Sequence, residues 1–273
     1  MNRIRNIYYG LIFIYTATGI LSVNAAETDV LPVESQAMGK KIHNLVILPD
    51  TYTNDLHNFP VVYILHGAGG DYTTMLNRIP ELENYADQYG FILICPDGGQ
   101  FSWYLDSPVL PRSQYETYIH SELISAVDAT YRTDTTARAI TGLSMGGHGA
   151  LYLAIKHPAL FAATGSMSGG VDITGFIDQW HIGEVTGIEY ESNPALKQFN
   201  VVDLICALEP DQHKIIIHCG TEDFFFEANQ RLHIKMLGCG IPHEYRTGPG
   251  AHDYGYWRQA IREQLMFFSD SFD

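Results

Sequence analysis

Short, almost continuous runs of apolar residues recur along the chain. Examples are VVYIL, FILIC and KIIIHC. Such continuous apolar runs are typical of strands that are buried on both faces, as in a parallel sheet covered by helices. The runs predict strands at Leu45–Leu48, Val61–Leu65, Phe91–Cys95, Ala139–Leu143, Ala162–Met167, Ile215–Cys219 and His243–Thr247.

Longer segments between these runs are typical of helices. Around Glu122, for example, Leu123, Ala126 and Val127 follow helical spacing. Helices are predicted at Thr73–Tyr89, Tyr115–Tyr131, Met145–Lys156, Phe225–Leu237 and Tyr254–Phe267. The alternation of strands and helices predicts an α/β fold with a mostly parallel central sheet and helices on both faces.

The segment Gly169–Asn200 does not follow this rhythm. It holds scattered glycines, Trp180, Tyr190 and Pro194, with no clear period, and it lies between two predicted strands. Long irregular segments inside a domain often form a lid or a wall of a binding site. A plain surface excursion is the equally weighted alternative.

Composition narrows the class of protein. The chain has 273 residues, of which 46% are hydrophobic and 17% charged, and this suits one large domain. The formal net charge of −15 would be repelled by phosphate backbones, so nucleic acid is not an expected partner. No pair of histidines shows HExxH spacing, so a metal-dependent hydrolase is not expected.

The first 25 residues have the pattern of a secretory signal. Arg3 and Arg5 precede an apolar run, and Val23-Asn24-Ala25 resembles a cleavage site. We expect cleavage after Ala25, export to the periplasm or the medium, a domain at residues 26–273 and no lasting membrane association. Removing two arginines would change the net charge from −15 to −17. An uncleaved membrane anchor is the competing interpretation.

Export would permit disulfides among the four cysteines, Cys95, Cys206, Cys219 and Cys239. The sequence leaves three complete pairings open. Cys95 and Cys219 lie in apolar, strand-like runs and are interpreted as buried thiols rather than bridge partners.

The sequence AITGLSMGGHGALYLA carries the strongest chemical signal. It places Ser144 between Gly142 and Gly146, at the junction of a predicted strand and a predicted helix. A strand-to-helix turn this tight needs small residues two positions away on each side, and it exposes the serine hydroxyl at the carboxyl edge of the sheet. The same turn aims the Met145 backbone N–H at a developing oxyanion. A glycine-rich turn with an incidental serine is the alternative.

A nucleophilic serine needs an acid and a histidine, which on such a fold follow it in that order. The strand ending at Cys219 leads into Gly220-Thr221-Glu222-Asp223, where both carboxylates qualify and Asp223 is preferred. Helix capping is the alternative role for either carboxylate. His252 follows the last predicted strand and is the expected base.

A second oxyanion donor is expected in the loop His66-Gly67-Ala68-Gly69-Gly70, after an early strand. Ala68 N–H is the preferred donor and Gly69 N–H the alternative. Gly67 and Gly69 would let the backbone approach the substrate. His66 is expected to hold the loop through a hydrogen bond.

The segment Phe101–Asp106 follows the strand that ends at Cys95, so it should also lie at the active-site edge. Trp103 and Tyr104 are candidate substrate-binding residues, because their rings could stack on a sugar or a feruloyl group. Ordinary packing is the equally weighted alternative.

Five motifs, HGAGG, PDGGQFSWYLDS, GLSMGGHGALYLA, HCGTEDFF and PGAHDYGYW, occur here in the order seen in one family. Over about residues 42–268 the chain resembles the esterase D-like α/β-hydrolases. That group includes the feruloyl and acetyl xylan esterases of carbohydrate esterase family 1, tributyrin esterases, S-formylglutathione hydrolases and antigen 85 mycolyltransferases.

The resemblance implies an α/β-hydrolase fold and a serine esterase without a cofactor. It implies Ser144 as nucleophile, His252 as base, Asp223 as acid, and Met145 and Ala68 as oxyanion donors. With export, it implies short acyl or feruloyl esters of plant polysaccharides or their fragments as substrates. An acyltransferase of the mycolyl type and a non-catalytic carbohydrate-binding relative are the alternatives.

Overall fold

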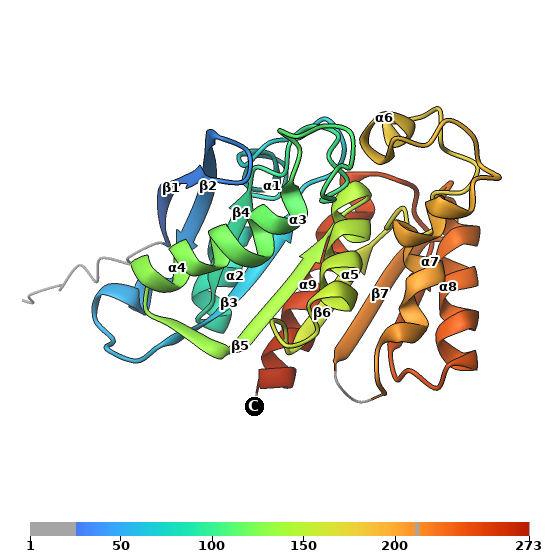
Figure 1. Ribbon diagram of the computed structural model, residues 1–273. Helices are drawn as coiled ribbons and strands as arrows, with labels where there is room; N and C mark the ends of the chain where they lie inside the picture. The colour runs from blue at the N-terminus through green and yellow to red at the C-terminus, as the bar shows by residue number, and fades with distance from the viewer. Residues whose placement is uncertain (1–25, 211–212, 273) are drawn as a thin grey trace, which may run out of the picture.

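One sheet of eight strands organises residues 26–210 and 213–272, the ranges that the computed structural model describes (Figure 1). The predicted signal segment, residues 1–25, lies outside them. The strand order is β1-β2-β4-β3-β5-β6-β7-β8. The strands are β1 (Glu27–Ser35), β2 (Lys40–Leu48), β3 (Phe59–Leu65), β4 (Ile92–Pro96), β5 (Thr133–Gly142), β6 (Ala163–Met167), β7 (Lys214–Gly220) and β8 (Glu244–Gly248).

Strand direction follows the predicted fold class. β1 pairs antiparallel with β2, and β2 pairs antiparallel with β4, whereas every pair from β4 to β8 is parallel. All seven predicted strands are present. β1 was not predicted, because its sequence ETDVLPVES carries acidic residues and Pro32 and most of it is exposed.

Helices cover both faces of the sheet (Figure 1). They are α1 (Thr74–Arg78), α2 (Leu82–Tyr89), α3 (Tyr115–Thr117), α4 (Ile124–Thr130), α5 (Met145–Lys156), α6 (Ile182–Thr186), α7 (Val201–Leu204), α8 (Phe226–Gly238) and α9 (Tyr254–Phe272). Short turns of other helix types are η1 (Asp50–Thr53), η2 (Tyr118–Leu123), η3 (Pro194–Gln198) and η4 (Ile205–Ala207).

The prediction of one helix at Thr73–Tyr89 is wrong. α1 ends at Arg78 and α2 begins at Leu82, with Pro80 between them. Proline lacks the N–H that an uninterrupted helix needs, and it disfavours helical backbone at the residue before it. In contrast, α3, η2 and α4 follow one another through the predicted helix Tyr115–Tyr131, with one π-helical segment in the middle.

Alternate residues of the central strands enter two separate cores. On β3, Val61 and Tyr63 pack in the core that includes α4, α5 and α8. Val62 and Ile64 face the other way and pack in the core formed with α1, α2 and α9. This two-sided burial explains the continuous apolar runs, because neither face of a central strand meets solvent. None of the helices in the described ranges is long and apolar enough to cross a bilayer.

The irregular segment at residues 169–200 lies above α7, beside the carboxyl ends of the parallel strands, and carries α6 and η3 (Figure 1). Its two ends are tied together. The Asn200 side chain accepts a hydrogen bond from Ile173 N–H at 3.0 Å, and Val202 N–H donates to Val171 O at 3.0 Å. The segment is therefore a closed excursion from the sheet.

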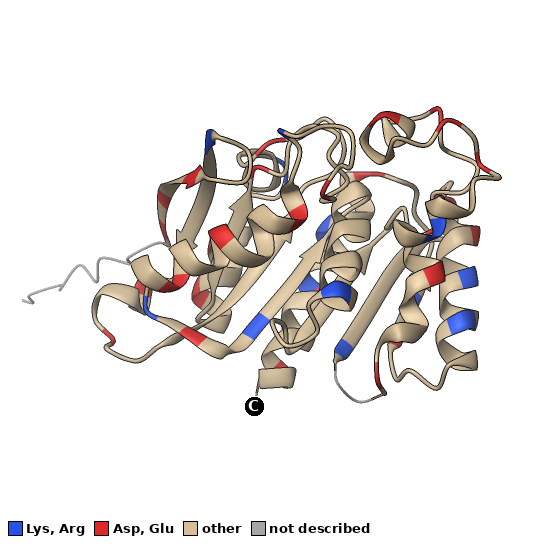
Figure 2. Ribbon diagram, viewed as in Figure 1, with Lys and Arg blue, Asp and Glu red and all other residues tan. Residues whose placement is uncertain are grey.

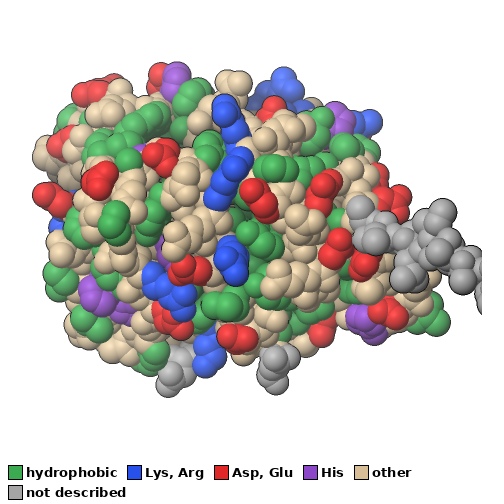
Figure 3. All heavy atoms as spheres, turned by 180° about the vertical axis from the view of Figure 1, so that it is seen from behind, with side chains coloured by type: hydrophobic (Ala, Val, Ile, Leu, Met, Phe, Trp, Pro, Cys, Tyr) green, Lys and Arg blue, Asp and Glu red, His purple; other side chains and the backbone are tan. Residues whose placement is uncertain are grey.

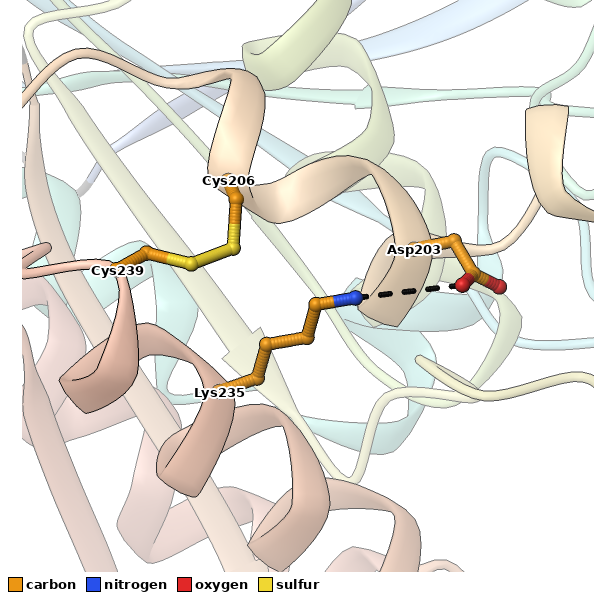
Figure 4. Close-up of a disulfide and its surroundings, with 4 residues drawn as sticks. All are labelled: Asp203, Cys206, Lys235 and Cys239. Atoms are coloured by element: carbon orange, nitrogen blue, oxygen red, sulfur yellow. Dashed lines mark ion pairs between the residues drawn. A yellow bond between two sulfur atoms is a disulfide. The ribbon is translucent and has the colours of Figure 1, made fainter.

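One disulfide joins Cys206 on η4 to Cys239, which directly follows α8 (Figure 4). The Cα atoms are 5.7 Å apart, within the usual range for a disulfide. Lys235 and Asp203 form an ion pair at 4.0 Å beside it. Cys95 on β4 and Cys219 on β7 are free and buried, as their apolar sequence context predicted.

Candidate active site

Ser144 lies in the turn between β5 and α5, in a backbone conformation that side chains rarely adopt. Its φ is 57° and its ψ is −119°. Such a conformation costs on the order of 1–3 kcal/mol and persists only where its surroundings enforce it. The Ser144 N–H donates to Met167 O at 2.9 Å, and its carbonyl accepts from His148 N–H at 3.1 Å. The turn is thus fixed from both sides.

The two glycines that flank Ser144 are required by close backbone approach. A Cβ atom added to Gly142 would lie 2.5 Å from the Gly146 carbonyl carbon. One added to Gly146 would lie 2.6 Å from the Leu65 carbonyl carbon and 2.7 Å from His66 O. Any larger residue at either position would push β3, β5 and α5 apart.

The structure brings Ser144, His252 and Asp223 into one chain of hydrogen bonds. Ser144 Oγ donates to His252 Nε2 at 2.9 Å. His252 Nδ1 donates to Asp223 at 3.0 Å from Oδ1 and 2.9 Å from Oδ2. The three residues come from the ends of β5, β8 and β7, so the parallel sheet edge gathers side chains that are far apart in sequence.

The structure also separates the two candidate acids. The Asp223 side chain is completely buried, whereas Glu222 is exposed. Asp223 Oδ1 additionally accepts the Phe225 N–H at 2.8 Å, so the carboxylate also caps the turn that leads into α8. Orienting His252 and capping are therefore compatible roles for one side chain.

Aromatic rings enclose His252. Phe224 lies 4.2 Å from the imidazole, centroid to centroid, and Trp257 lies 4.8 Å away on edge. These rings restrict the imidazole to the orientation in which it reaches both Ser144 and Asp223.

The loop after β3 supplies the other wall of the site. Gly69 N–H donates to Gln100 O at 2.7 Å, so it is already used. Among the described residues, no acceptor is recorded for the N–H groups of Ala68 and Met145. Ala68 lines the same cleft as Ser144, and Met145 directly follows Ser144 in the sequence. Their N–H groups are available to an oxyanion.

His66 holds this loop, as the sequence predicted. Its Nδ1 donates to Gly67 O at 2.8 Å, and its Nε2 accepts the Gly98 N–H at 3.0 Å. Burial lowers the pKa of His66, which keeps the ring neutral and preserves this donor–acceptor arrangement. The loop that bears Ala68 is thereby pinned to the segment after β4.

Ser144 and His252 open onto a cleft of about 790 Å³. Gly67, Ala68 and Gly69 line it, where the sequence placed them. The polar residues of its lining include Asp71, Thr73, Thr74, Asn77 and Arg78. The apolar residues include Leu143, Trp180, Phe224 and Trp257. An ester with polar and apolar parts matches this mixed lining.

The predicted stacking roles of Trp103 and Tyr104 are wrong, and the packing alternative holds. Trp103 is 2% exposed, Tyr104 is fully buried, and neither lines the cleft. Their φ angles of 55° and 59° turn both side chains inward. The Tyr104 hydroxyl donates to His66 O at 3.1 Å, and Trp103 Nε1 donates to Trp180 O at 3.0 Å. Through these hydrogen bonds, the two buried side chains hold the backbone of His66 and Trp180 in place.

The aromatic residues that line the cleft with accessible surface are instead Phe224, which is exposed, and Trp180 and Tyr254, which are partly exposed. The rings of Trp180 and Phe224 stack at 5.7 Å with an interplanar angle of 17°. The sequence held two signals for them: Phe224 directly follows Asp223, and Trp180 is the one tryptophan in the irregular segment. Neither signal states that the two rings meet.

The arrangement is able to carry out acyl transfer. It combines a hydroxyl nucleophile, an imidazole that can take its proton, a buried carboxylate that orients the imidazole, and two unused N–H donors. Within the described ranges, no group of three histidine, cysteine or carboxylate side chains could hold a metal ion.

Comparison with known proteins identifies the relatives of this chain. The family model named Esterase matches residues 35–268. An esterase of Mycobacterium tuberculosis is 28% identical over 237 residues, covering 76% of this chain and 51% of that protein. The diacylglycerol acyltransferase/mycolyltransferase Ag85B of Mycobacterium leprae is 34% identical over 185 residues, covering 63% of this chain and 54% of that protein. The chain thus spans about half the length of these curated relatives.

Solved structures agree on the fold. A ferulic acid esterase superimposes with a TM-score of 0.77 at 24% identity, covering 91% of this chain and 99% of that one. An S-formylglutathione hydrolase from Agrobacterium tumefaciens superimposes with a TM-score of 0.80 at 20% identity, covering 92% and 97%. Both superpositions support the α/β-hydrolase fold that the motifs implied.

Proposed function

The chain belongs to the Esterase family of α/β-hydrolases, and on that premise we propose that it is an exported serine carboxylesterase acting through Ser144, His252 and Asp223. The observation that carries the proposal is the unbroken hydrogen-bond chain from Ser144 Oγ to the Asp223 carboxylate. In the proposed substrate, a short acyl or feruloyl group esterifies a plant polysaccharide or one of its fragments.

The first half of the reaction forms an acyl-serine. His252 Nε2 accepts the Ser144 proton as Oγ attacks the ester carbonyl, and the imidazolium returns that proton to the departing alcohol oxygen. Asp223 holds the proton on Nδ1 and stabilises the charged ring. In the second half His252 takes a proton from water as the water oxygen attacks the acyl-serine carbonyl. The imidazolium then returns that proton to the departing Ser144 Oγ, and the carboxylic acid is released.

Ala68 and Met145 form the oxyanion hole in this proposal. Their N–H groups stabilise the negative charge on the tetrahedral carbonyl oxygen. The loss of one such donor typically lowers kcat by about 10²–10³-fold. The strained Ser144 backbone and the His66 hydrogen bonds fix the donors before the substrate arrives.

The basic activity is tested with p-nitrophenyl acetate. The wild-type protein should hydrolyse it, and Ser144→Ala should reduce kcat to background, because no other hydroxyl occupies that position. Ser125→Ala, a change of an exposed serine outside the cleft, is the matched control. Hydrolysis that survives in Ser144→Ala would remove the proposed nucleophile.

The substrate class is tested with methyl ferulate, acetylated xylan and tributyrin. The proposal expects methyl ferulate or acetylated xylan to have the highest kcat/KM. A preference for tributyrin would leave an esterase but contradict the polysaccharide assignment. The support for it is the cleft itself, which polar side chains line together with Trp180 and Phe224.

Export is proposed from the signal pattern at residues 1–25, and the Cys206–Cys239 disulfide supports it, because disulfides persist mainly in oxidising compartments. The mature protein should begin at Ala26. Intact mass measurement of the protein recovered from the periplasm or medium checks this. Recovery of a full-length chain in the membrane fraction would favour the anchor.

Acyl transfer to an alcohol is the second candidate, supported by the similarity to Ag85B. The acyl-serine is common to both reactions, so the acceptor decides. Product analysis with a sugar acceptor in water separates them: a new sugar ester means transfer, and free acid means hydrolysis.

A further inference from the structure

A second cavity adjoins the cleft that contains Ser144. It has a volume of about 710 Å³. Residues from the stretch 177–189 of the irregular segment line it, together with Val109. Of the residues that the structure describes, Trp180 alone lines both cavities. The indole is therefore the wall over which a ligand would pass from one cavity to the other.

Trp180 is held firmly in this position. Its backbone has a φ of 44°, and its carbonyl accepts the hydrogen bond from the buried Trp103 at 3.0 Å. Its ring stacks on Phe224, which in turn packs on His252. A fixed, partly exposed indole next to a catalytic cleft offers a flat apolar surface at low entropic cost.

The side chains of the second cavity indicate the chemistry of its ligand. Asp178, Glu184 and Glu189 supply carboxylates, which accept hydrogen bonds and donate none. Glu184 already accepts one from His181 Nδ1 at 2.8 Å, whereas Asp178 and Glu189 are exposed. An alkyl chain would strip water from these carboxylates without replacing its hydrogen bonds. A ligand rich in hydroxyl groups would replace them.

We propose that this cavity is a subsite for the alcohol part of the ester, a neutral sugar chain that crosses the Trp180 ring. The inference rests on the proposed esterase function and specifies its substrate. Hydroxyl groups donate to Asp178 and Glu189, while the apolar face of one sugar ring stacks on the indole. The ester then lies over Ser144, one or more sugar units from the occupied subsite.

The charge of the segment selects neutral chains. Residues 169–200 contain five carboxylates and one lysine, and Figure 2 shows acidic residues on the segment around α6. Lys40 and Arg112 lie near Glu184, but in a separate pocket and not in the second cavity. A chain that carries uronic acids would meet like charge here. The subsite should therefore reject anionic glycans that the cleft alone would accept.

The test compares monoacetylated xylotriose with p-nitrophenyl acetate. In Trp180→Ala, kcat/KM should fall about tenfold more for the oligosaccharide than for the small ester, mainly through KM, because one stacking surface is lost. Tyr190→Ala is the matched control: Tyr190 is an exposed aromatic residue of the same segment that lines neither cavity. The Tyr190→Ala variant should keep the wild-type kcat/KM for both substrates.

The double variant Asp178→Asn, Glu189→Gln gives a second readout that needs no change at Trp180. It should raise the rate on acetylated, uronic-acid-bearing xylo-oligosaccharides relative to neutral ones. Loss of structure alone would not produce that change in the ratio of the two rates. The rejection of anionic chains should weaken severalfold, as expected for two removed like charges at a solvent-exposed site.

Several results would overturn the subsite. One is an equal fall for both substrates in Trp180→Ala, and another is an unchanged neutral-to-anionic ratio in the double variant. A third is a wild-type kcat/KM no higher for acetylated xylotriose than for acetylated methyl xyloside. A preference for long-chain p-nitrophenyl esters would place an acyl chain there instead. The esterase proposal fails separately, if the wild-type protein hydrolyses no ester or Ser144→Ala stays active.

Discussion

Asp223 illustrates how one side chain can serve both chemistry and fold. Its carboxylate accepts from His252 Nδ1 and from the Phe225 N–H, and its side chain is shielded from water. An amide of the same shape would keep the packing but would present an N–H to the imidazole. The wrong tautomer of His252 would follow.

Asp223→Asn should therefore lower kcat by about 10⁴-fold with little change in KM. Steady-state kinetics with p-nitrophenyl acetate measures the effect. Glu222→Gln changes the adjacent, exposed carboxylate and should leave kcat within about twofold of wild type. A large effect of Glu222→Gln together with a small effect of Asp223→Asn would reverse the assignment of the acid.

Gly146→Ala should inactivate the enzyme and destabilise it by about 1–3 kcal/mol, because the new methyl group would collide with the backbone of Leu65 and His66. Those residues lead directly into the loop that carries Ala68. Gly238→Ala is the control. Gly238 belongs to α8 and has open space around it, so alanine there should be neutral or slightly stabilising. Chemical denaturation and activity, measured on both variants, distinguish the two sites.

At the residue scale, the sequence located the three members of the hydrogen-bond chain, because a GxSxG turn and the order serine, acid, histidine constrain their positions strongly. It failed for Trp103 and Tyr104. Their place after β4 was right, but the direction of their side chains depends on two consecutive positive φ angles that no pattern signals. Phe224 and Trp180 occupy the surface that those rings were expected to form.

At the scale of elements, the disulfide fastens η4 to the C-terminal end of α8 (Figure 4). Replacing both Cys206 and Cys239 by serine should lower the free energy of unfolding by about 2–4 kcal/mol, since the bridge closes a loop of 33 residues. Urea denaturation of the oxidised wild type and the double variant measures this. The activity of the folded variant should persist, because the bridge lies outside the cleft; unchanged stability would contradict the prediction.

Three elements meet at Glu263 of α9. Its carboxylate accepts hydrogen bonds from His218 of β7 at 3.1 Å and from Arg246 of β8 at 2.9 Å. Burial by itself would raise the pKa of Glu263, but the hydrogen bonds from His218, Arg246 and Gln259 lower it to about 2. A lowered carboxyl pKa stabilises the fold above the unfolded pKa near 4.5, and this stabilisation is lost as the pH falls toward 2.

Glu263→Gln should cost about 1 kcal/mol at neutral pH, a value discounted for the partial exposure of the carboxylate. The difference between wild type and variant should shrink between pH 5 and pH 2, as the wild-type carboxylate takes up its proton. Thermal unfolding across that range checks the slope. A constant difference would show that packing, rather than charge, explains the loss.

Buried strands were predictable because a two-sided apolar environment leaves a continuous pattern. β1 was not, since an exposed edge strand needs no apolar run, and its pairing with β2 is decided by backbone hydrogen bonds. Pro80 lies between two stretches with helical periodicity, so periodicity alone predicts one helix there. The bounds of α1 and α2 show that the proline separates the two helices.

For the whole molecule, the net charge of −15 is spread unevenly over the surface. The irregular segment is acidic, whereas Figure 3 shows basic side chains gathered in a column on the face seen from behind. Arg246, Arg258 and Arg262 line one hollow of about 720 Å³. Fold class followed from the order of elements alone, but this separation of charge depends on which helices share a face.

The two free thiols make the stability of this sheet measurable strand by strand. Burial raises the pKa of Cys95 to about 12, and that of Cys219 rises further. The reactive thiolate is thus almost absent at neutral pH in the closed protein. Cys95 lies on the third strand in sheet order and Cys219 on the seventh, on opposite sides of β5, which leads into the turn that bears Ser144.

Alkylation of either cysteine should therefore wait for the sheet to open around it, and its rate should report the free energy of that opening. If the sheet opens as one unit, the two cysteines will be modified with the same opening free energy under native conditions. If Cys219 reacts first, the β7–β8 side separates while the β3–β4 side is still closed, and inactivation on warming would begin at the side that holds Asp223 and His252.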